Sequence, residues 1–163
     1  MRYILSIVAI TLMLASCSNK QDNNIISRSF TNEEWSRFDY LNGEIDIKDV
    51  PAKYDIVMEV VLNEIYPNAY ENSRHDCSLK FNMTIKNPND NGARSRDYNY
   101  NLKDKDGNWK ADKKDGYYTF KLPIISGMTL GEEGIYQFKI ENKYPKDPLQ
   151  GIKSIDIKCI TSK

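Results

Sequence analysis

The sequence has little of what catalytic and metal sites are usually built from. Its 163 residues include one histidine, His75, and three cysteines. A serine or cysteine nucleophile needs a neighbouring base, and the chain has no Gly-x-Ser-x-Gly elbow and no phosphate-binding glycine loop. Two cysteines and one histidine do not complete a tetrahedral metal site without carboxylates. We therefore expect no catalytic activity, no bound metal and no cofactor.

The chain also lacks a charge of one sign and a long hydrophobic run. Lys plus Arg and Asp plus Glu each number 23, so the formal net charge is zero. Proteins that bind nucleic acid favour a basic face, so this balance argues against a nucleic-acid partner. The apolar run at residues 4–13 is too short to span a bilayer. The length of the chain predicts a single domain.

The first residues form an export signal. Arg2 supplies a cationic start, and residues 4–13 have the length of a signal-peptide apolar region. Leu14, Ala15 and Ser16 then precede Cys17 and match the bacterial lipobox, in which the cysteine thiol accepts the lipid. An ordinary signal peptide with an incidental cysteine is the alternative.

The lipobox divides the chain into three parts. Residues 1–16 are the expected lipoprotein signal peptide, and residues 17–24 are a lipidated cysteine followed by a flexible polar tether. Palmitate-type acyl chains on Cys17 would anchor the protein, because several chains bind a membrane stably. We expect an outer-membrane lipoprotein of the cell envelope, on its periplasmic or its surface face. Residues 25–163 form the domain.

The mature chain alternates apolar and polar residues with a period of two, which indicates half-buried strands. Residues 77–86 give the clearest example, since Leu79, Phe81 and Met83 alternate with polar side chains. Residues 54–62 are apolar on both faces and predict a central strand buried on both sides. The other predicted strands cover residues 25–30, 38–47, 98–102, 118–124, 136–140 and 155–160.

Turn signals separate these strands. Asp106 and Gly107 mark a turn between two strand-like runs, and residues 87–92 read as an exposed loop. Residues 31–34 resemble a capping box and predict one helical turn around Trp35. Seven to eight short strands with few helices predict an all-β fold, an antiparallel β-sandwich of immunoglobulin-like or jelly-roll type.

Two cysteines remain after Cys17. Cys77 and Cys159 both fall on the inward-reading faces of predicted strands. Compartments outside the inner membrane oxidise such pairs, and a bridge would add roughly 3 to 5 kcal/mol in the chain-entropy model. The alternative is two separate buried thiols that act as small hydrophobes.

Two further features are candidate binding sites. Residues 104–109 place oxygen ligands at alternate positions, but Trp109 stands where a calcium loop needs its glycine, so a hairpin turn is the better interpretation. Trp35, Trp109, Tyr117 and Tyr118 are candidates for contact with a sugar or a protein partner. Packing within the sandwich is the simpler role for these aromatics.

The C-terminal half resembles the gliding-motility lipoproteins of the GldH type. The resemblance is carried by a strand, an Asp-Gly-x-Trp turn, a Gly-x-Tyr-x-Phe strand and a Leu-x-Gly-Ile approach to the last strand, at residues 100–102, 104–109, 134–141 and 148–152. It implies an envelope lipoprotein needed for gliding and associated with type IX secretion. The family brings no catalytic residues, and the loop at residues 88–96 departs from its pattern.

We therefore expect a lipid-anchored, non-catalytic accessory protein with partners among envelope proteins. A glycan-binding lipoprotein is the first alternative, and it predicts an exposed coplanar aromatic pair beside a groove. A hydrolase that uses a carboxylate pair is the second, and it predicts two facing carboxylates, one with a raised pKa. The interaction role predicts an exposed apolar patch instead.

Overall fold

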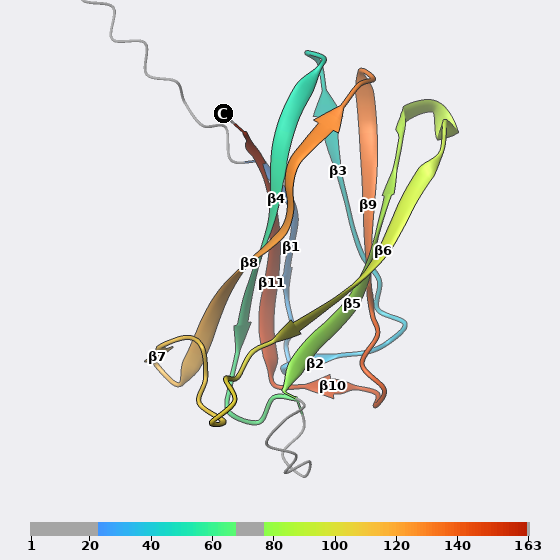
Figure 1. The fold of residues 1–163 in the computed structure, drawn as a ribbon. Coiled ribbons are helices and arrows are strands. Elements are labelled where there is room, and N and C mark those ends of the chain that lie inside the picture. Colours follow the sequence, from blue (N-terminus) through green and yellow to red (C-terminus); the bar gives the residue numbers. More distant parts are fainter. Residues whose placement is uncertain (1–22, 68–76, 163) are drawn as a thin grey trace, which may run out of the picture.

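Two antiparallel sheets face each other in the computed structural model, which describes residues 23–67 and 77–162 (Figure 1). The first sheet has the strand order β1 (Asn23–Ser29), β11 (Ile152–Thr161), β4 (Ala52–Leu62), β8 (Tyr117–Leu130), β7 (Lys113–Lys114). The second has the order β3 (Leu41–Ile47), β9 (Gly134–Asn142), β5 (Ser78–Lys86), β6 (Ala93–Asn101). The strands β2 (Glu34–Trp35) and β10 (Leu149–Gln150) pair at one end, and η1 (Pro88–Asp90) is a single 3-10 turn.

The predicted all-β sandwich is confirmed. The described chain has eight strands of seven residues or more, together with three strands of two residues. Strand β5 illustrates the reason, because Leu79, Phe81 and Met83 are buried between the sheets while Lys80 and Asn82 face outward. A period of two places every second side chain in the core, and that burial fixes the register of the ladder.

The predicted central strand is β4, which lies between β11 and β8. Its inward residues Ile56, Met58 and Val60 are completely buried. Its outward residues Val57 and Val61 are only half-buried, since nothing in the described chain covers that face of the sheet. The strand was therefore predicted correctly, but its burial on both sides was not.

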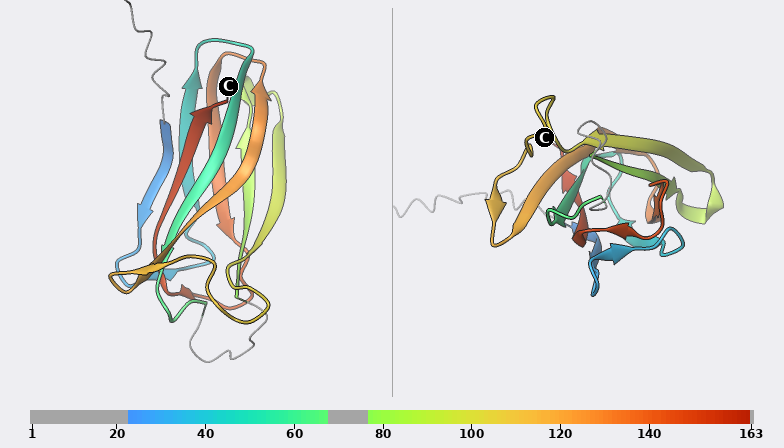
Figure 2. Two further views of the ribbon diagram at one scale, coloured as in Figure 1. Left: turned by 60° about the vertical axis from the view of Figure 1, so that its left-hand side comes forward. Right: turned by 90° about the horizontal axis from the view of Figure 1, so that it is seen from below.

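One side of the sandwich is closed by contact between β1 and β3. A Cβ atom on Gly43 would lie 2.1 Å from the carbonyl oxygen of Ile25, so only glycine lets the two backbones come this close. On the opposite side, β6 is the last strand of its sheet, and β8 has no second neighbour beyond the two residues that pair with β7. Figure 2 shows β6 and the upper part of β8 side by side across this open side.

Four local features differ from the sequence predictions. No helical turn forms around Trp35, because Glu33 has a φ of 54° and Glu34–Trp35 pairs with β10 as strand β2. Strand β6 begins at Ala93, inside the segment expected to be a loop. Strand β8 continues to Leu130, six residues past the predicted end. The described domain also begins two residues before residue 25, since Asn23 already pairs with Cys159.

The described strands place the start of the domain far from one set of loops. Strand β1 begins at one end of the sandwich, and the loops around β2 and β10 lie at the other end (Figures 1 and 2). Within the described residues, no helix is long and apolar enough to cross a membrane.

Candidate functional site

Two residues singled out in the sequence lie outside the described residues. These are Cys17, the expected lipid acceptor, and His75, the lone histidine. Lipidation of Cys17 stays a prediction.

Cys77 and Cys159 do not form the disulfide that the sequence suggested. Neither cysteine is bridged, and both are buried. Cys77 directly precedes β5 at the end of the sandwich where β2 and β10 lie, whereas Cys159 is close to the end of β11 at the opposite end (Figure 1). Their alternation patterns placed both side chains inward, but a pattern along one strand does not say which end of the core a residue reaches. Burial raises the pKa of the Cys159 thiol to about 12.

Trp35 is fully buried and therefore not a contact residue for a ligand. Its ring packs 6.0 Å from that of Phe30, and its indole N–H donates to the carbonyl oxygen of Asp39 at 2.8 Å. This hydrogen bond satisfies the one polar group that a buried tryptophan carries. The residue holds the crossing segment from β1 to β3 against the core.

Of the other three candidate aromatics, Tyr118 lies in the core, Trp109 packs against it, and Tyr117 contacts polar neighbours. Trp109 stacks on Tyr118 with 4.5 Å between ring centroids, and the ammonium of Lys103 lies 4.5 Å from the Trp109 ring. Tyr117 donates its hydroxyl to the Glu33 carboxylate at 2.7 Å. The structure brings the rings of Trp109 and Tyr118 together, whereas the ring of Trp35 packs against that of Phe30. No exposed platform forms from the predicted set.

Residues 104–109 form a turn closed from within. Asp104 accepts hydrogen bonds from the backbone N–H groups of Asp106 and Asn108, each at 2.9 Å. These bonds hold the pKa of the Asp104 carboxyl below its usual range. The bridge between Lys103 and Trp109 confirms the hairpin turn. No cluster of metal-ligating side chains occurs among residues 23–67 and 77–162.

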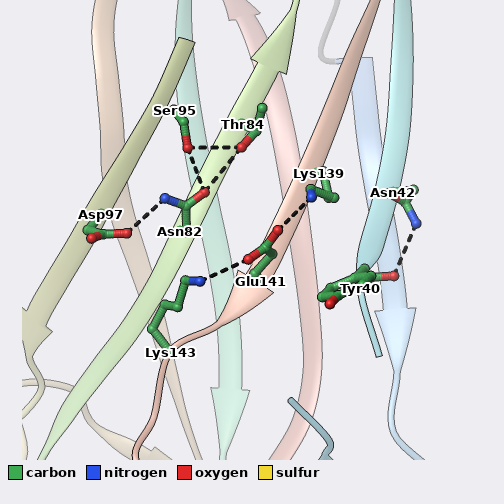
Figure 3. Close-up of polar contacts among 9 residues, drawn as sticks. All are labelled: Tyr40, Asn42, Asn82, Thr84, Ser95, Asp97, Lys139, Glu141 and Lys143. Atoms are coloured by element: carbon green, nitrogen blue, oxygen red, sulfur yellow. Dashed lines mark hydrogen bonds and ion pairs between the residues drawn. The ribbon is translucent and has the colours of Figure 1, made fainter. Parts of the chain in front are cut away.

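The outer face of the second sheet carries a connected set of polar side chains, which is drawn in Figure 3. Asn82 is its centre: its amide donates to Asp97 at 2.8 Å, and its oxygen accepts from Ser95 at 3.0 Å and from Thr84 at 3.2 Å. Direct cross-strand pairing explains this grouping, because Asn82 stands opposite Asp97 and Thr84 opposite Ser95.

A charged row continues this face across β9. Lys139 and Lys143 lie 2.6 and 2.9 Å from the two oxygens of Glu141 (Figure 3). Hydrogen bonds from Lys139 and then Lys143 lower the pKa of Glu141. The Lys139 ammonium also lies 5.2 Å from the ring of Tyr40, so an aromatic residue borders the charged row.

Phe38 and Tyr40 form an aromatic patch at the margin of this face. Phe38 is 75% exposed and Tyr40 is 45% exposed, which is unusual for side chains of this size. They border a hollow of about 410 Å³ whose other walls include Arg37, Lys143 and Pro145. The guanidinium of Arg37 donates to the carbonyl oxygens of Tyr144, at 3.1 Å, and Pro145, which fixes the loop beneath Phe38.

A shallow groove lies beside the patch on the same sheet. It has a volume of about 680 Å³ and a floor of backbone at Gly43 and Phe138. Its walls are polar side chains from β3, β5 and β9, namely Asn42, Glu44, Thr84, Lys86, Gln137 and Lys139. Patch and groove together make the outer face of the second sheet the main candidate for contact.

This face was not predicted from the sequence. Phe38 and Tyr40 were assigned to a strand over residues 38–47, and neither was predicted to make an external contact. Strand β3 instead begins at Leu41, so both residues lie in the preceding loop and turn outward. The available signal for their exposure was that both aromatics stand before the first aliphatic residue of the alternating run.

The protein is thus an all-β domain with an outer sheet face suited to contact. Its described part has no cluster of metal-ligating side chains. Comparison with known families identifies it further: the GldH lipoprotein family matches residues 26–159. The chain belongs to that family, as the resemblance of its motifs predicted. Membership among lipoproteins implies association with the cell envelope.

The similar solved structures are distant. One is a family GH115 4-O-methyl-α-glucuronidase, BtGH115A, at 14% identity and a TM-score of 0.39, covering 88% of this chain and 16% of that enzyme. Another is GEBA250068378 from Sulfurospirillum deleyianum, at 13% identity and a TM-score of 0.40, covering 86% of this chain and 99% of that one. The chain thus corresponds to a small part of the first protein's length. No curated protein matches the chain.

Proposed function

We propose that this protein is a non-catalytic accessory lipoprotein of the outer membrane, anchored through Cys17, that binds a protein partner through the aromatic patch of Phe38 and Tyr40. The partner belongs to the envelope machinery of gliding and type IX secretion. Family membership supports the location in the cell envelope. The 75% exposure of Phe38 is the main observation in favour of a protein contact at the patch. Exposed aromatics that border a hollow are typical anchors of protein interfaces.

The placement of the patch suits an anchored protein. Strand β1 begins at the end of the sandwich opposite the loops around β2 and β10 (Figure 1). Five residues lie between Cys17 and Asn23, and the six steps from one to the other span roughly 20 Å at most. The patch follows β2 in the chain, so it would project away from the membrane, toward partners outside the bilayer.

Two carboxyl groups, those of Asp104 and Glu141, are unsuited to act as a general acid. A hydrolase needs a general acid whose pKa is raised. The pKa of Asp104 and that of Glu141 are instead both lowered, because hydrogen bonds and lysine ammonium groups favour the charged forms.

The test is crosslinking in intact cells with the tagged, lipidated protein, followed by affinity purification and mass spectrometry. We expect recovery of secretion or motility components, a loss of at least tenfold with Phe38→Ala, and no recovery with Cys17→Ala. An anchor truncated to alanine typically costs 2 kcal/mol or more, about thirtyfold in affinity. Ile65→Ala is the matched control, since Ile65 is 48% exposed on a different loop. Equal recovery with both alanine variants would contradict the assignment of the patch.

A glycan is the second candidate ligand, and the groove on the same sheet face favours it. Its walls combine amide, hydroxyl, carboxylate and ammonium groups, which suit the hydroxyl groups of a sugar. Tyr40 supplies a ring at its margin. A glycan array probed with the purified protein tests this candidate. Binding that is lost with Gln137→Ala and kept with Phe38→Ala would favour the glycan over the protein partner.

A further inference from the structure

The open side of the sandwich carries a second surface, separate from the aromatic patch. Strand β6 ends its sheet, and nothing in the described chain pairs with its outer edge. Strand β8 is likewise unpaired on one side beyond its two-residue contact with β7. Two sheet edges therefore face the same opening, each with a row of backbone groups available to a further strand.

A hollow of about 380 Å³ separates these two edges. Its apolar lining comes from both sheets, with Met83 and Ile85 on one side and Ile125 and Met128 on the other. The rim is formed by β6 itself, through Arg94, Arg96 and Tyr98. The hollow thus combines an apolar lining with a cationic rim.

The rim residues follow the inner face of β6 in alternation. Arg94, Arg96, Tyr98 and Tyr100 stand opposite Ile85, Met83, Phe81 and Leu79 of β5. The Arg96 guanidinium lies 5.5 Å from the Tyr98 ring, and the rings of Tyr98 and Tyr100 are parallel to within 2°. None of the ion pairs within the described ranges 23–67 and 77–162 involves either arginine.

Tyr100 limits the length of the opening. Its hydroxyl donates to the carbonyl oxygen of Pro123 on β8 at 2.6 Å, so the two sheets are joined at that level. Between Tyr100 and the start of β6, residues 93–98 have no strand paired with their outer edge in the described chain. Six residues correspond to roughly 20 Å of extended chain, the length of an ordinary strand.

We propose that this cleft accepts an extended acidic segment of a partner protein, which adds to the edge of β6 as a further strand of the second sheet. Carboxylates at alternate positions of that segment would stand beside Arg94 and Arg96 on the inner face. Opposite charges in neighbouring positions of adjacent strands stabilise the pairing, and arginine binds a carboxylate with two hydrogen bonds.

The same charges disfavour a second copy of this chain as the occupant. An antiparallel pairing of two β6 strands about Ser95 would set arginine against arginine, which is destabilising. Inward-facing charges on an edge strand are a known protection against such self-association. An acidic strand removes the repulsion and keeps the backbone pairing. This inference does not depend on Phe38 or Tyr40.

The probe is a fluorescent, capped octapeptide that alternates glutamate with threonine, titrated against the purified lipidated protein in detergent micelles. Anisotropy measures its affinity. We expect the same residues with the glutamates contiguous to bind at least tenfold more weakly, since only alternation places the carboxylates on one face. N-methylation of the peptide backbone at every glutamate or at every threonine should abolish binding for one of the two sets, because alternate N–H groups pair with the acceptor edge.

Charge reversal identifies the site. The double variant Arg94→Glu and Arg96→Glu should lose at least tenfold in affinity and should bind an alternating lysine–threonine peptide instead. Lys121→Glu with Lys158→Glu is the matched control, since both lysines lie near Glu59 on the outer face of the first sheet. Phe38→Ala should bind the peptide normally, so this result is separate from the proposed function. Equal binding of alternating, contiguous and N-methylated peptides, or no effect of the reversal, would overturn the proposal.

Discussion

Asn142 donates its side-chain amide to the carbonyl oxygen of Trp35 at 3.0 Å, and both residues are buried. The Asn142 oxygen accepts the backbone N–H of Tyr144 at 2.8 Å. One side chain therefore satisfies polar groups of two segments that close the end of the sandwich. A buried backbone group without a partner is costly, so this arrangement makes β9 and β2 depend on each other.

Replacement of Asn142 by alanine should lower the free energy of unfolding by about 2 to 3 kcal/mol, because two buried backbone groups lose their partner. Urea unfolding followed by circular dichroism measures the change. Asn99→Ala on β6 is the control, since Asn99 is exposed and its loss should change stability by less than about 0.5 kcal/mol. A similar stability for both variants would show that the buried amide contributes little.

Gly43→Ala should destabilise the domain severely. The added Cβ would lie 2.1 Å from the Ile25 carbonyl oxygen, so β1 and β3 could not keep their present approach. We expect a loss of more than about 3 kcal/mol, or separation of β1 from the domain. Thermal unfolding and hydrogen exchange of β1 report these outcomes. Gly131→Ala is the control, because nothing lies within 4 Å of its Cβ position. A neutral Gly43→Ala would contradict the closed side of the sandwich.

The Cys159 thiol should make the protein less stable at alkaline pH. Its pKa is raised by burial, and by the nearby charge of Asp55, to about 12, against roughly 8.5 in an unfolded chain. The stabilising contribution is fully present below pH 8.5 and is lost as the pH rises toward 12. Urea unfolding between pH 7 and pH 10 should show this loss in the wild type and less of it in Cys159→Ala. An identical slope in both proteins would rule out the thiol as its source.

The two unbridged cysteines at opposite ends of the core lead to a second prediction. The folded protein should migrate identically with and without reductant, and its thiols should react with a maleimide only after unfolding. Mass spectrometry after labelling in 6 M guanidinium should find both Cys77 and Cys159 modified. A bridge between them, detected as an unreactive pair, would contradict the separation seen in the structure.

The Trp109–Tyr118 stack should hold the segment that crosses between the sheets. Trp109 is half-buried, and its ring lies 4.5 Å from that of Tyr118. Trp109→Ala should increase hydrogen exchange in residues 102–116, at a cost of about 1 to 3 kcal/mol in overall stability. Trp109→Phe should restore most of the protection, since a smaller ring still stacks. If hydrogen exchange were unchanged in the alanine variant, the backbone turn alone would account for the ordering of this segment.

Alternation along single strands predicted most of the fold. Leu79 to Ile85, Tyr136 to Ile140 and Ile155 to Cys159 each carry enough apolar side chains of period two to specify a half-buried strand. The extension of β6 to Ala93 was missed because Arg94 and Arg96 occupy inward positions at an open edge, where charge is tolerated. The end of β8 was missed because the register shifts between its pairs with Ile56 and Val57 interrupt the alternation.

The candidate contact surfaces could not be read from the chain in the same way. Cross-strand neighbours such as Asn82 and Asp97 come from different strands, and strand order is decided by how the sheets pack. The family resemblance was carried by turns and strands of the scaffold, and it did not point to Phe38 or Arg94.

By itself the sequence determined the all-β class, the position of most strands and the match to a lipoprotein family, because these depend on residues near one another in the chain. Only the tertiary structure decided that Cys77 and Cys159 lie at opposite ends, that Trp35 is buried while Phe38 is exposed, and that β6 and β8 leave one side open. Those relations depend on which strands become neighbours, and burial is a property of neighbours that are distant in sequence.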